Sequence, residues 1–253
     1  MRLHRWIYAM AVLLVAYFLF NLQDPLVRIA AYRQLYRHHP FYVPEGIKTS
    51  LEIILCLVAV ALALGRNFRL TAAELRLDRG FIRGALFALL ATAPTAIGLA
   101  GTHGIGRLSW HAIAYLAFFA PFAEELVMRA YAFGQLHRRC GWPVWLAALV
   151  TGIIFGWGHI EKGTNFFEMA ALFLITATGG VFFAWFFYRW DSIWFPFMGH
   201  ALMNFYWELF SVSRTALGGW YPFAVQTTTI LFAAFVTWRF APPKMKVATL
   251  AAG

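Results

Sequence analysis

Two adjacent glutamates, Glu124 and Glu125, and Arg129 lie in a stretch from Trp110 to His137 that is otherwise apolar enough to cross a membrane. A charged side chain near the bilayer centre costs about 2.5 to 3.5 kcal/mol, so it is retained mainly where it faces a cavity, a partner or a reaction. Glu125 precedes Arg129 by four residues, the favourable order for an ion pair on one helix face. Glu124 is turned about 100° away from that face. The sequence therefore singles out Glu124 for chemistry.

Two other apolar segments carry polar residues at helical spacing. Phe155 and His159 are four residues apart, as are His200 and Asn204, so each pair shares one helix face. Histidine can exchange protons, and asparagine can donate hydrogen bonds to an oxyanion. A rise of 1.5 Å per residue puts Asn204, Glu124 and the two histidines about 14 to 25 Å above the predicted inner boundary. We expect these four side chains to meet in one cavity formed by three helices.

Several other hydrolytic sites are missing from the sequence. There is no His-Glu-x-x-His zinc motif and no Gly-x-Ser-x-Gly nucleophile motif. The aspartates all lie near predicted helix ends, which argues against a buried aspartyl pair. Glu124, His159 and His200 would suffice to hold a catalytic zinc ion. Glu124 could equally act as a general base without a metal, and this is the alternative that we favour.

The composition indicates the environment of these residues. The chain has 253 residues, of which 61% are hydrophobic and only 13% are charged, well outside the range of soluble domains. We predict an all-α, polytopic bundle that forms a single integral membrane domain over residues 1–253. Eight apolar runs are long enough to cross about 30 Å of hydrocarbon. They cover residues 6–22, 47–64, 81–99, 110–135, 142–160, 166–188, 192–212 and 220–240.

The net charge of +10 is spread between these runs, so we expect a lipid bilayer and no nucleic acid as partner. About two thirds of the 21 Lys and Arg residues fall on the inside if the N-terminus is cytoplasmic. We therefore predict a multi-pass protein of the bacterial inner membrane with both termini in the cytoplasm. The basic and aromatic connection from Pro25 to Pro40 could form an interfacial helix in the headgroups.

Other features of the sequence suggest structural roles. The first 64 residues show no cluster of reactive groups, so we expect them to serve as scaffold and to set orientation. Cys56 in a predicted span and Cys140 in a predicted loop indicate a buried small side chain and a surface thiol rather than a disulfide framework. Pro121 should bend the fourth span or remove a backbone hydrogen bond near Glu124.

Three motifs at about residues 110 to 210 resemble, in order, those of the CPBP intramembrane proteases. They are Glu124-Glu125-Leu-Val-Met-Arg129, Phe155-x-x-x-His159 and His200-x-x-x-Asn204. This family includes the type II CAAX prenyl proteases, the bacteriocin-processing or immunity proteins of the Abi group, and the myxosortase-like branch. The flanking predicted spans match it only in number and hydrophobicity.

The resemblance implies an endopeptidase that cleaves near the C-terminus of a membrane-anchored or C-terminally tagged protein, or removes its leader or sorting signal. Carried over by motif, Glu124 would activate water, His159 would assist, and His200 with Asn204 would stabilise the oxyanion. The remaining motif residues, Glu125, Arg129 and Phe155, would be supporting. Members have been described both as metalloproteases and as glutamic proteases, so the resemblance implies either no cofactor or one zinc ion.

The depth estimate places the site in the outer half of the membrane, which would suit a sorting or leader substrate better than a cytosolic prenyl-cysteine. Gly156 and Gly158 would then admit an extended substrate backbone beside His159. Two other functions remain open. A transporter would use Glu124 and His159 as a proton relay, although no inverted repeat is apparent. A non-catalytic member of the fold would bind partners in the membrane.

Overall fold

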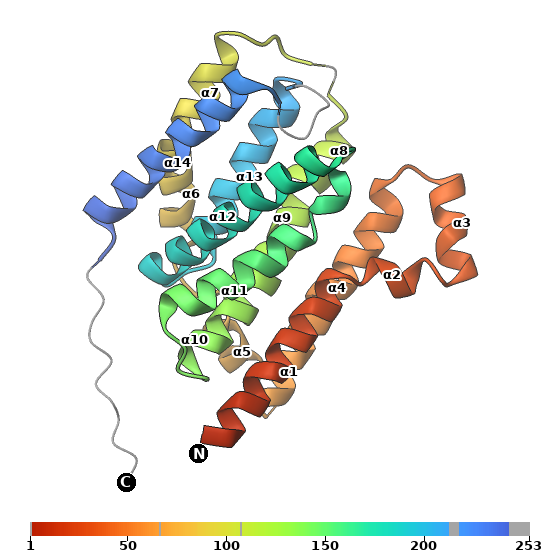
Figure 1. Cartoon of the computed structure of the whole chain (residues 1–253), viewed down its shortest axis with the longest axis vertical. Coiled ribbons are helices and arrows are strands. Elements are labelled where there is room, and N and C mark those ends of the chain that lie inside the picture. The colour runs from red at the N-terminus through yellow and green to blue at the C-terminus, as the bar shows by residue number, and fades with distance from the viewer. Residues whose placement is uncertain (1, 66, 107, 213–217, 243–253) are drawn as a thin grey trace.

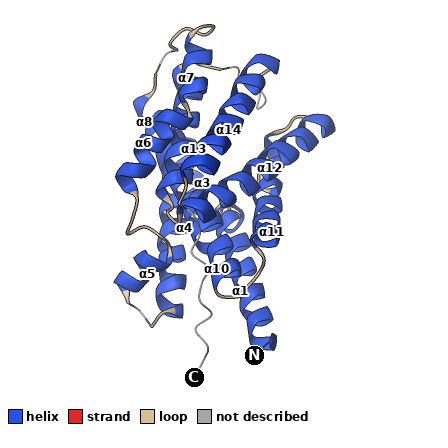
Figure 2. Ribbon diagram, turned by 90° about the vertical axis from the view of Figure 1, so that its left-hand side faces the viewer, coloured by secondary structure: helices blue, strands red, loops and turns tan. Residues whose placement is uncertain are grey.

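The computed structural model describes residues 2–65, 67–106, 108–212 and 218–242, and this part of the chain contains helices and no strand (Figures 1 and 2). The all-α prediction is confirmed. The helices are α1 Arg2–Phe20, α2 Gln23–Leu26, α3 Ala30–His38, α4 Tyr42–Ala63, α5 Phe68–Glu74, α6 Phe81–Ala91, α7 Ala93–Ala100, α8 Trp110–Ile113, η1 Ala114–Phe119, α9 Ala120–Glu125, η2 Leu126–Phe133, α10 Gly134–Arg138, α11 Val144–Trp157, η3 Ile160–Lys162, α12 Phe166–Trp190, α13 Trp194–Leu209 and α14 Trp220–Phe240.

Seven helical segments in the described residues are long and apolar enough to cross a membrane. They are Leu3–Phe20, Tyr42–Ala63, Phe81–Ala100, Trp110–Arg138, Val144–Lys162, Phe166–Trp190 and Trp220–Phe240. The eighth predicted span, 192–212, is the 16-residue helix α13, which at 1.5 Å per residue is about 24 Å long. α13 packs against α6 and η1 inside the bundle. The eighth predicted span is therefore present as a helix that is shorter than the other seven and is packed inside the bundle.

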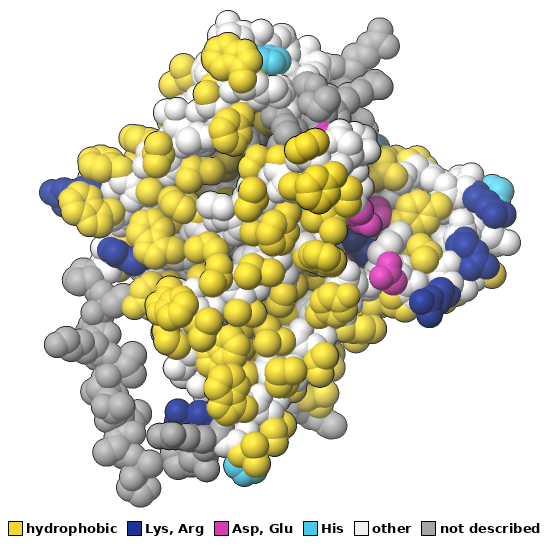
Figure 3. Space-filling view, in the orientation of Figure 1, with side chains coloured by type: hydrophobic (Ala, Val, Ile, Leu, Met, Phe, Trp, Pro, Cys, Tyr) yellow, Lys and Arg dark blue, Asp and Glu magenta, His cyan; other side chains and the backbone are white. Residues whose placement is uncertain are grey.

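The outer surface of the bundle is apolar (Figure 3). Leucines on three different helices, Leu14, Leu62 and Leu231, are each more than half exposed. Exposed apolar surface on this scale is unusual for a soluble monomer, whereas a bilayer provides the matching solvent for it. The chain is an integral membrane protein.

The segment Trp110–Arg138 forms the centre of the bundle. Every residue from Glu125 to Leu136 is buried, and η2 contacts α1, α4, α11 and α12. Two π-helical stretches, η1 and η2, flank the short α-helix α9 that carries both glutamates. π-helical turns are rare and often occur at functional sites. The most polar segment of the sequence is thus the most enclosed one.

Helices α2 and α3 form an arm that projects sideways from the bundle (Figure 1). Tyr32 is the buried residue of α3, and its hydroxyl donates to the carbonyl oxygen of Pro44 at 3.0 Å. Arg28, Arg33 and Arg37 are exposed on the arm, where Figure 3 shows a group of basic side chains. The helix expected between Pro25 and Pro40 is present, and its place in the headgroups stays a prediction.

Candidate active site

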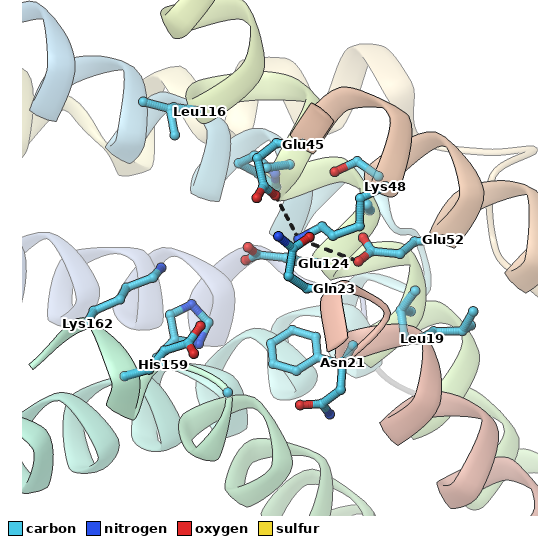
Figure 4. A pocket seen from close by; sticks show the side chains of 18 of the residues that line it. Leu19, Asn21, Gln23, Glu45, Lys48, Glu52, Leu116, Glu124, His159 and Lys162 are labelled. Carbon is cyan, nitrogen blue, oxygen red and sulfur yellow. Dashed lines mark ion pairs between the residues drawn. The ribbon is translucent and has the colours of Figure 1, made fainter. Parts of the chain in front are cut away.

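A cavity of about 650 Å³ lies between the α1–α4 pair and the central segment. Glu124, His159 and Asn204, which come from three different segments, all line it, and Figure 4 shows the first two. The fourth predicted residue, His200, is not among the lining residues. Its Nε2 atom lies 3.9 Å from Oε2 of Glu124. The four side chains predicted to meet therefore lie in one region, where three of them line the cavity and His200 lies beside Glu124 without lining it.

Glu125 has no exposed side-chain surface, and its Oε2 lies 3.1 Å from Nε of Arg129, which is 1% exposed. The predicted ion pair is confirmed. The other oxygen, Oε1, lies 2.9 Å from Nδ1 of His200. The buried carboxylate of Glu125 therefore contacts both Arg129 and His200, and it fixes the orientation of the His200 ring. Sequence reasoning predicted the first contact and missed the second.

Aromatic rings surround this buried pair. The Arg129 guanidinium carbon lies 4.3 Å from the ring centre of Phe155 and 5.6 Å from that of Phe183. Within the described residues, Nη1 and Nη2 of Arg129 have no hydrogen-bond partner. The faces of the two rings stabilise the guanidinium charge instead, through cation–π contacts. Phe155 also lies 4.5 Å from the His159 ring, and Phe183 stacks on His200 at 5.4 Å. Phe155 therefore supports two motif residues, and Phe183 is a supporting residue that the sequence did not single out.

The contacts of His159 leave one of its ring nitrogens available. His159 follows the end of α11, and its Nδ1 lies 2.8 Å from the carbonyl oxygen of Phe155. A carbonyl oxygen only accepts hydrogen bonds, so Nδ1 carries the hydrogen in this arrangement. In the neutral ring, Nε2 of His159 then has a free lone pair, and His159 lines the cavity together with Glu124. His159 can accept a proton there or hold a water molecule.

Asn204 is positioned by an interruption in the central helix. Along η1 the amide of Ala120 bonds to the carbonyl of Tyr115, five residues back. The same spacing would pair Leu116 with Pro121, which has no N–H. The freed Leu116 oxygen accepts a hydrogen bond from Nδ2 of Asn204 at 3.1 Å. The loss of a backbone hydrogen bond expected at Pro121 is thus visible, and it fixes the amide of Asn204, whose second N–H has no partner among the described residues.

Helix α4 contributes a wall of charged residues to the cavity. Lys48 Nζ lies 3.0 Å from Glu45 Oε2 and 3.7 Å from Glu52 Oε1, and all three residues line the cavity (Figure 4). Glu45 Oε2 also accepts from the Tyr115 hydroxyl at 3.3 Å. The expectation that the first 64 residues serve only as scaffold is therefore wrong. The predicted span began at residue 47, so the spacing of Glu45, Lys48 and Glu52 on one helix face was not recognised.

The two glycines before His159 allow close packing, but not by a substrate. A Cβ on Gly156 would lie 2.8 Å from the Phe173 carbonyl oxygen in α12, and one on Gly158 would lie 1.9 Å from the Phe20 ring. The space beside both glycines is therefore already filled by the protein itself. The prediction that they admit an extended substrate backbone is corrected: Gly156 lets α12 approach α11, and Gly158 makes room for Phe20.

The donor geometry at the site does not match a metal centre. Among the described residues, no three His, Cys, Asp or Glu side chains are placed to hold one metal ion. No step is therefore derived through zinc. Both cysteines are free and buried, which corrects the expectation of a surface thiol at Cys140.

Comparison with known proteins assigns the region that carries the site. Residues 106–206 match the family model of the Rce1-like type II CAAX prenyl endopeptidases. No curated protein and no solved structure shows significant similarity to the chain. The matched segment contains the whole central helix and all three motifs whose side chains meet at the cavity. Over residues 106–206, this match supports the resemblance of the chain to the CPBP, or CAAX-type, intramembrane proteases.

Proposed function

We propose that this protein is an endopeptidase that cleaves membrane-anchored proteins close to their C-terminus with a water molecule activated by Glu124. The observation that supports it best is the shared cavity of about 650 Å³, where Glu124 and His159 face the same space from different segments. The catalytic core would comprise residues 110–210, with α4 supplying the opposite wall. The family match favours proteolysis over the other chemistries of a carboxylate and a histidine.

In this proposal Glu124 removes a proton from water, and Nε2 of His159 holds the same water by its free lone pair. The hydroxide formed attacks the carbonyl carbon of the scissile peptide. The proton on Glu124 then passes to the leaving nitrogen as the carbon–nitrogen bond breaks. The oxygen from water ends in the new carboxylate, and the released fragment carries a new amino terminus.

The negative oxygen of the intermediate needs donors in fixed positions. Asn204 offers the N–H that Leu116 does not use. His200 does not line the cavity, so in this proposal its Nε2, which lies 3.9 Å from Oε2 of Glu124, orients that carboxylate while Nδ1 is held by Glu125. Glu125 and Arg129 then act as positioning residues, because they orient His200 without touching the substrate.

The test is a deletion strain complemented with either the wild-type gene or a Glu124→Gln version. Peptide mass spectrometry of membrane proteins should detect peptides from uncleaved C-termini in the deletion strain. These peptides should disappear when the strain carries the wild-type gene and remain when it carries the Glu124→Gln version. Equal rescue by the Glu124→Gln gene would favour a binding role for the same fold. Proton-coupled flux in reconstituted vesicles, lost in the same variant, would indicate a transporter instead.

A further inference from the structure

The arm formed by α2 and α3 has two chemically different sides. One side belongs to the cavity wall, because Gln23 and Tyr36 line the cavity. The other side, which we call the arginine face, carries three exposed residues of the basic group in Figure 3: Arg28, Arg33 and Arg37. Within the described residues, none of these arginines lines the cavity or forms an ion pair. No described carboxylate therefore neutralises these charges by contact.

Backbone contacts organise the arginine face. Nη1 of Arg33 donates to the carbonyl oxygens of Val27 at 2.8 Å and of Arg28 at 2.9 Å. These bonds hold the Arg33 guanidinium over the turn between α2 and α3, beside Arg28. Arg37 lies one helical turn beyond Arg33, so the two share a face of α3. A guanidinium fixed in this way can still offer its other N–H groups to a phosphate as paired hydrogen bonds.

The connectivity of the chain places the arm at a surface of the membrane. The arm joins the end of α1 to the start of α4, and both helices are long and apolar enough to span. A connection between two consecutive spans lies at one face of the bilayer, at the level of the headgroups. Ile29 and Phe41, which flank α3, are 53% and 43% exposed. Exposed apolar side chains beside basic ones are typical of helices that lie in the interface.

The uncovered side of α3 fits a partner of one kind. α3 packs against α4, and its buried residue Tyr32 bonds to Pro44 of that helix. The arginine face is turned by one residue from Tyr32, and at headgroup depth the most abundant anions are lipid phosphates. We propose that the arginine face is a binding surface for the headgroups of anionic phospholipids. This inference goes beyond the proposed function and does not depend on it. A bound lipid would hold the arm, and with it one wall of the cavity, at the membrane surface.

A local probe on the arm can measure this binding. The full chain, in neutral detergent, carries Cys56→Ala, Cys140→Ala and Gln34→Cys, and an environment-sensitive dye is attached to the new thiol. Gln34 is exposed and follows Arg33 in α3. The protein is titrated with short-chain phosphatidylglycerol and, separately, with short-chain phosphatidylcholine. An arginine near an anionic lipid surface strengthens binding about fivefold, so the half-maximal concentration should be at least about tenfold lower for phosphatidylglycerol.

Substitutions in this background identify the groups responsible. Arg28→Gln combined with Arg37→Gln removes two charges but keeps Arg33, whose hydrogen bonds hold the turn. The preference for phosphatidylglycerol should fall at least about fivefold. Arg28→Lys combined with Arg37→Lys keeps the charges and should keep most of the preference. The matched control is Arg69→Gln combined with Arg83→Gln, two exposed arginines in α5 and α6, and it should leave the signal at Gln34→Cys unchanged.

Two further titrations distinguish lipid from other sources of negative charge. Inorganic phosphate and a short peptide of glutamates are each added to the complex with phosphatidylglycerol, and neither should displace the lipid at an equal concentration. Displacement by phosphate would show an adventitious ion only, and displacement by the peptide would make the arm a docking surface for acidic proteins; either result overturns the proposal. Equal binding of the two lipids to the unsubstituted protein, or an unchanged preference after Arg28→Gln with Arg37→Gln, would overturn it as well.

Discussion

Two charged regions, one at each end of α4, differ in how completely their charges are paired. Beyond the C-terminal end of α4, Glu74 lies 3.1 Å from Arg139 and 3.5 Å from Arg138. In the cavity near its N-terminal half, Lys48 is paired with Glu45 and Glu52, but Glu124 has His200 as its nearest charged neighbour at 3.9 Å, and Lys162 has no ion pair among the described residues. Charges that pair with each other hold segments together, and charges without a close partner remain available for a substrate.

Asp191 extends the paired region. Its carboxylate lies 2.8 Å from Arg76 and 3.4 Å from Arg79, which ties the loop before α6 to the turn after α12. The fourth span reaches both regions, with Glu124 at the cavity and Arg138 at the paired end. For charges that retain contact with solvent, the two regions therefore predict different outcomes of similar substitutions: loss of stability at the paired end and loss of activity at the cavity.

The side of the membrane that each region faces is tested by an all-or-none labelling experiment. The connection from α7 to α8 lies at the top in Figure 1, and α5 lies at the bottom. A Cβ at Gly104 in that connection would have no atom within 4 Å. In a Cys56→Ala, Cys140→Ala background, Gly104→Cys should react with an impermeant thiol reagent on intact cells.

The control for this labelling is Ala248→Cys, a position outside the described residues, which should react only after the cells are opened. The opposite pattern would place the cavity end of the bundle toward the cytoplasm. A sorting or leader substrate would then be ruled out, and a cytosolic C-terminus such as that of a prenylated protein would take its place.

The largest change in stability is expected at the buried pair behind the cavity. Arg129→Ala leaves the Glu125 carboxylate, which has no exposed surface, without its cation. Breaking a buried pair costs about 3 to 5 kcal/mol, so the thermal unfolding midpoint should fall sharply. Glu125→Gln should also destabilise the protein and disturb His200. A midpoint unchanged in both variants, followed by tryptophan fluorescence, would show that the pair is not structural.

A smaller change is expected at the paired end. Partial burial opposes ionisation of Glu74, but the hydrogen bond from Arg139 and the charges of Arg138 and Arg139 outweigh it, so the pKa of Glu74 lies below its ordinary value. Its contribution is therefore present at pH values above the unfolded pKa of about 4.3 and is lost as the pH falls through the folded pKa.

Glu74→Gln should accordingly destabilise the protein by about 1 kcal/mol at neutral pH, the upper range for pairs that retain contact with solvent. The difference from the wild type should shrink as the pH falls below about 4. Unfolding midpoints of the two proteins, measured over that pH range, check the sign. A difference that grew at acid pH would contradict the assignment of this ion pair.

The smallest change is expected on removal of metal ions. Since the described residues do not form a three-ligand group, purified protein should contain less than one zinc ion per chain and should keep its activity in a strong chelator. Elemental analysis and activity before and after chelation provide the measurement. One tightly held zinc per chain, with activity lost on removal and restored on return, would reverse our preference for a metal-free mechanism.

Sequence reasoning succeeded where a contact is local. Glu125 and Arg129 lie one helical turn apart, so their pairing follows from helix geometry. The closeness of Glu124, His159 and Asn204 was also predicted, from their estimated heights above the inner membrane boundary. Such heights can be compared because helices that cross a membrane run nearly parallel. The all-α class followed from composition alone.

The missed features depend on the rotation of each helix about its own axis and on where each helix begins and ends. Hydropathy specifies neither. The contact of His200 with Glu125 requires α13 to turn one face toward α9, and the stacking of Phe183 on His200 requires the same of α12. Glu45 was missed because α4 begins at Tyr42, five residues before the predicted span 47–64, and without Glu45 the partner of Lys48 in that span was not recognised. Polar residues near a span end look like loop residues in sequence, although here they line the cavity.

The central claim is that Glu124 is the group that activates water, and one reconstitution tests it most directly. Wild-type protein and the Glu124→Gln variant, which differ only in the replacement of one carboxylate oxygen by an amide nitrogen, are placed in liposomes with a candidate C-terminal substrate peptide. The account predicts cleavage by the wild type, a loss of about 10²- to 10⁴-fold in the variant, and unfolding midpoints that agree closely. Normal turnover by Glu124→Gln would contradict it.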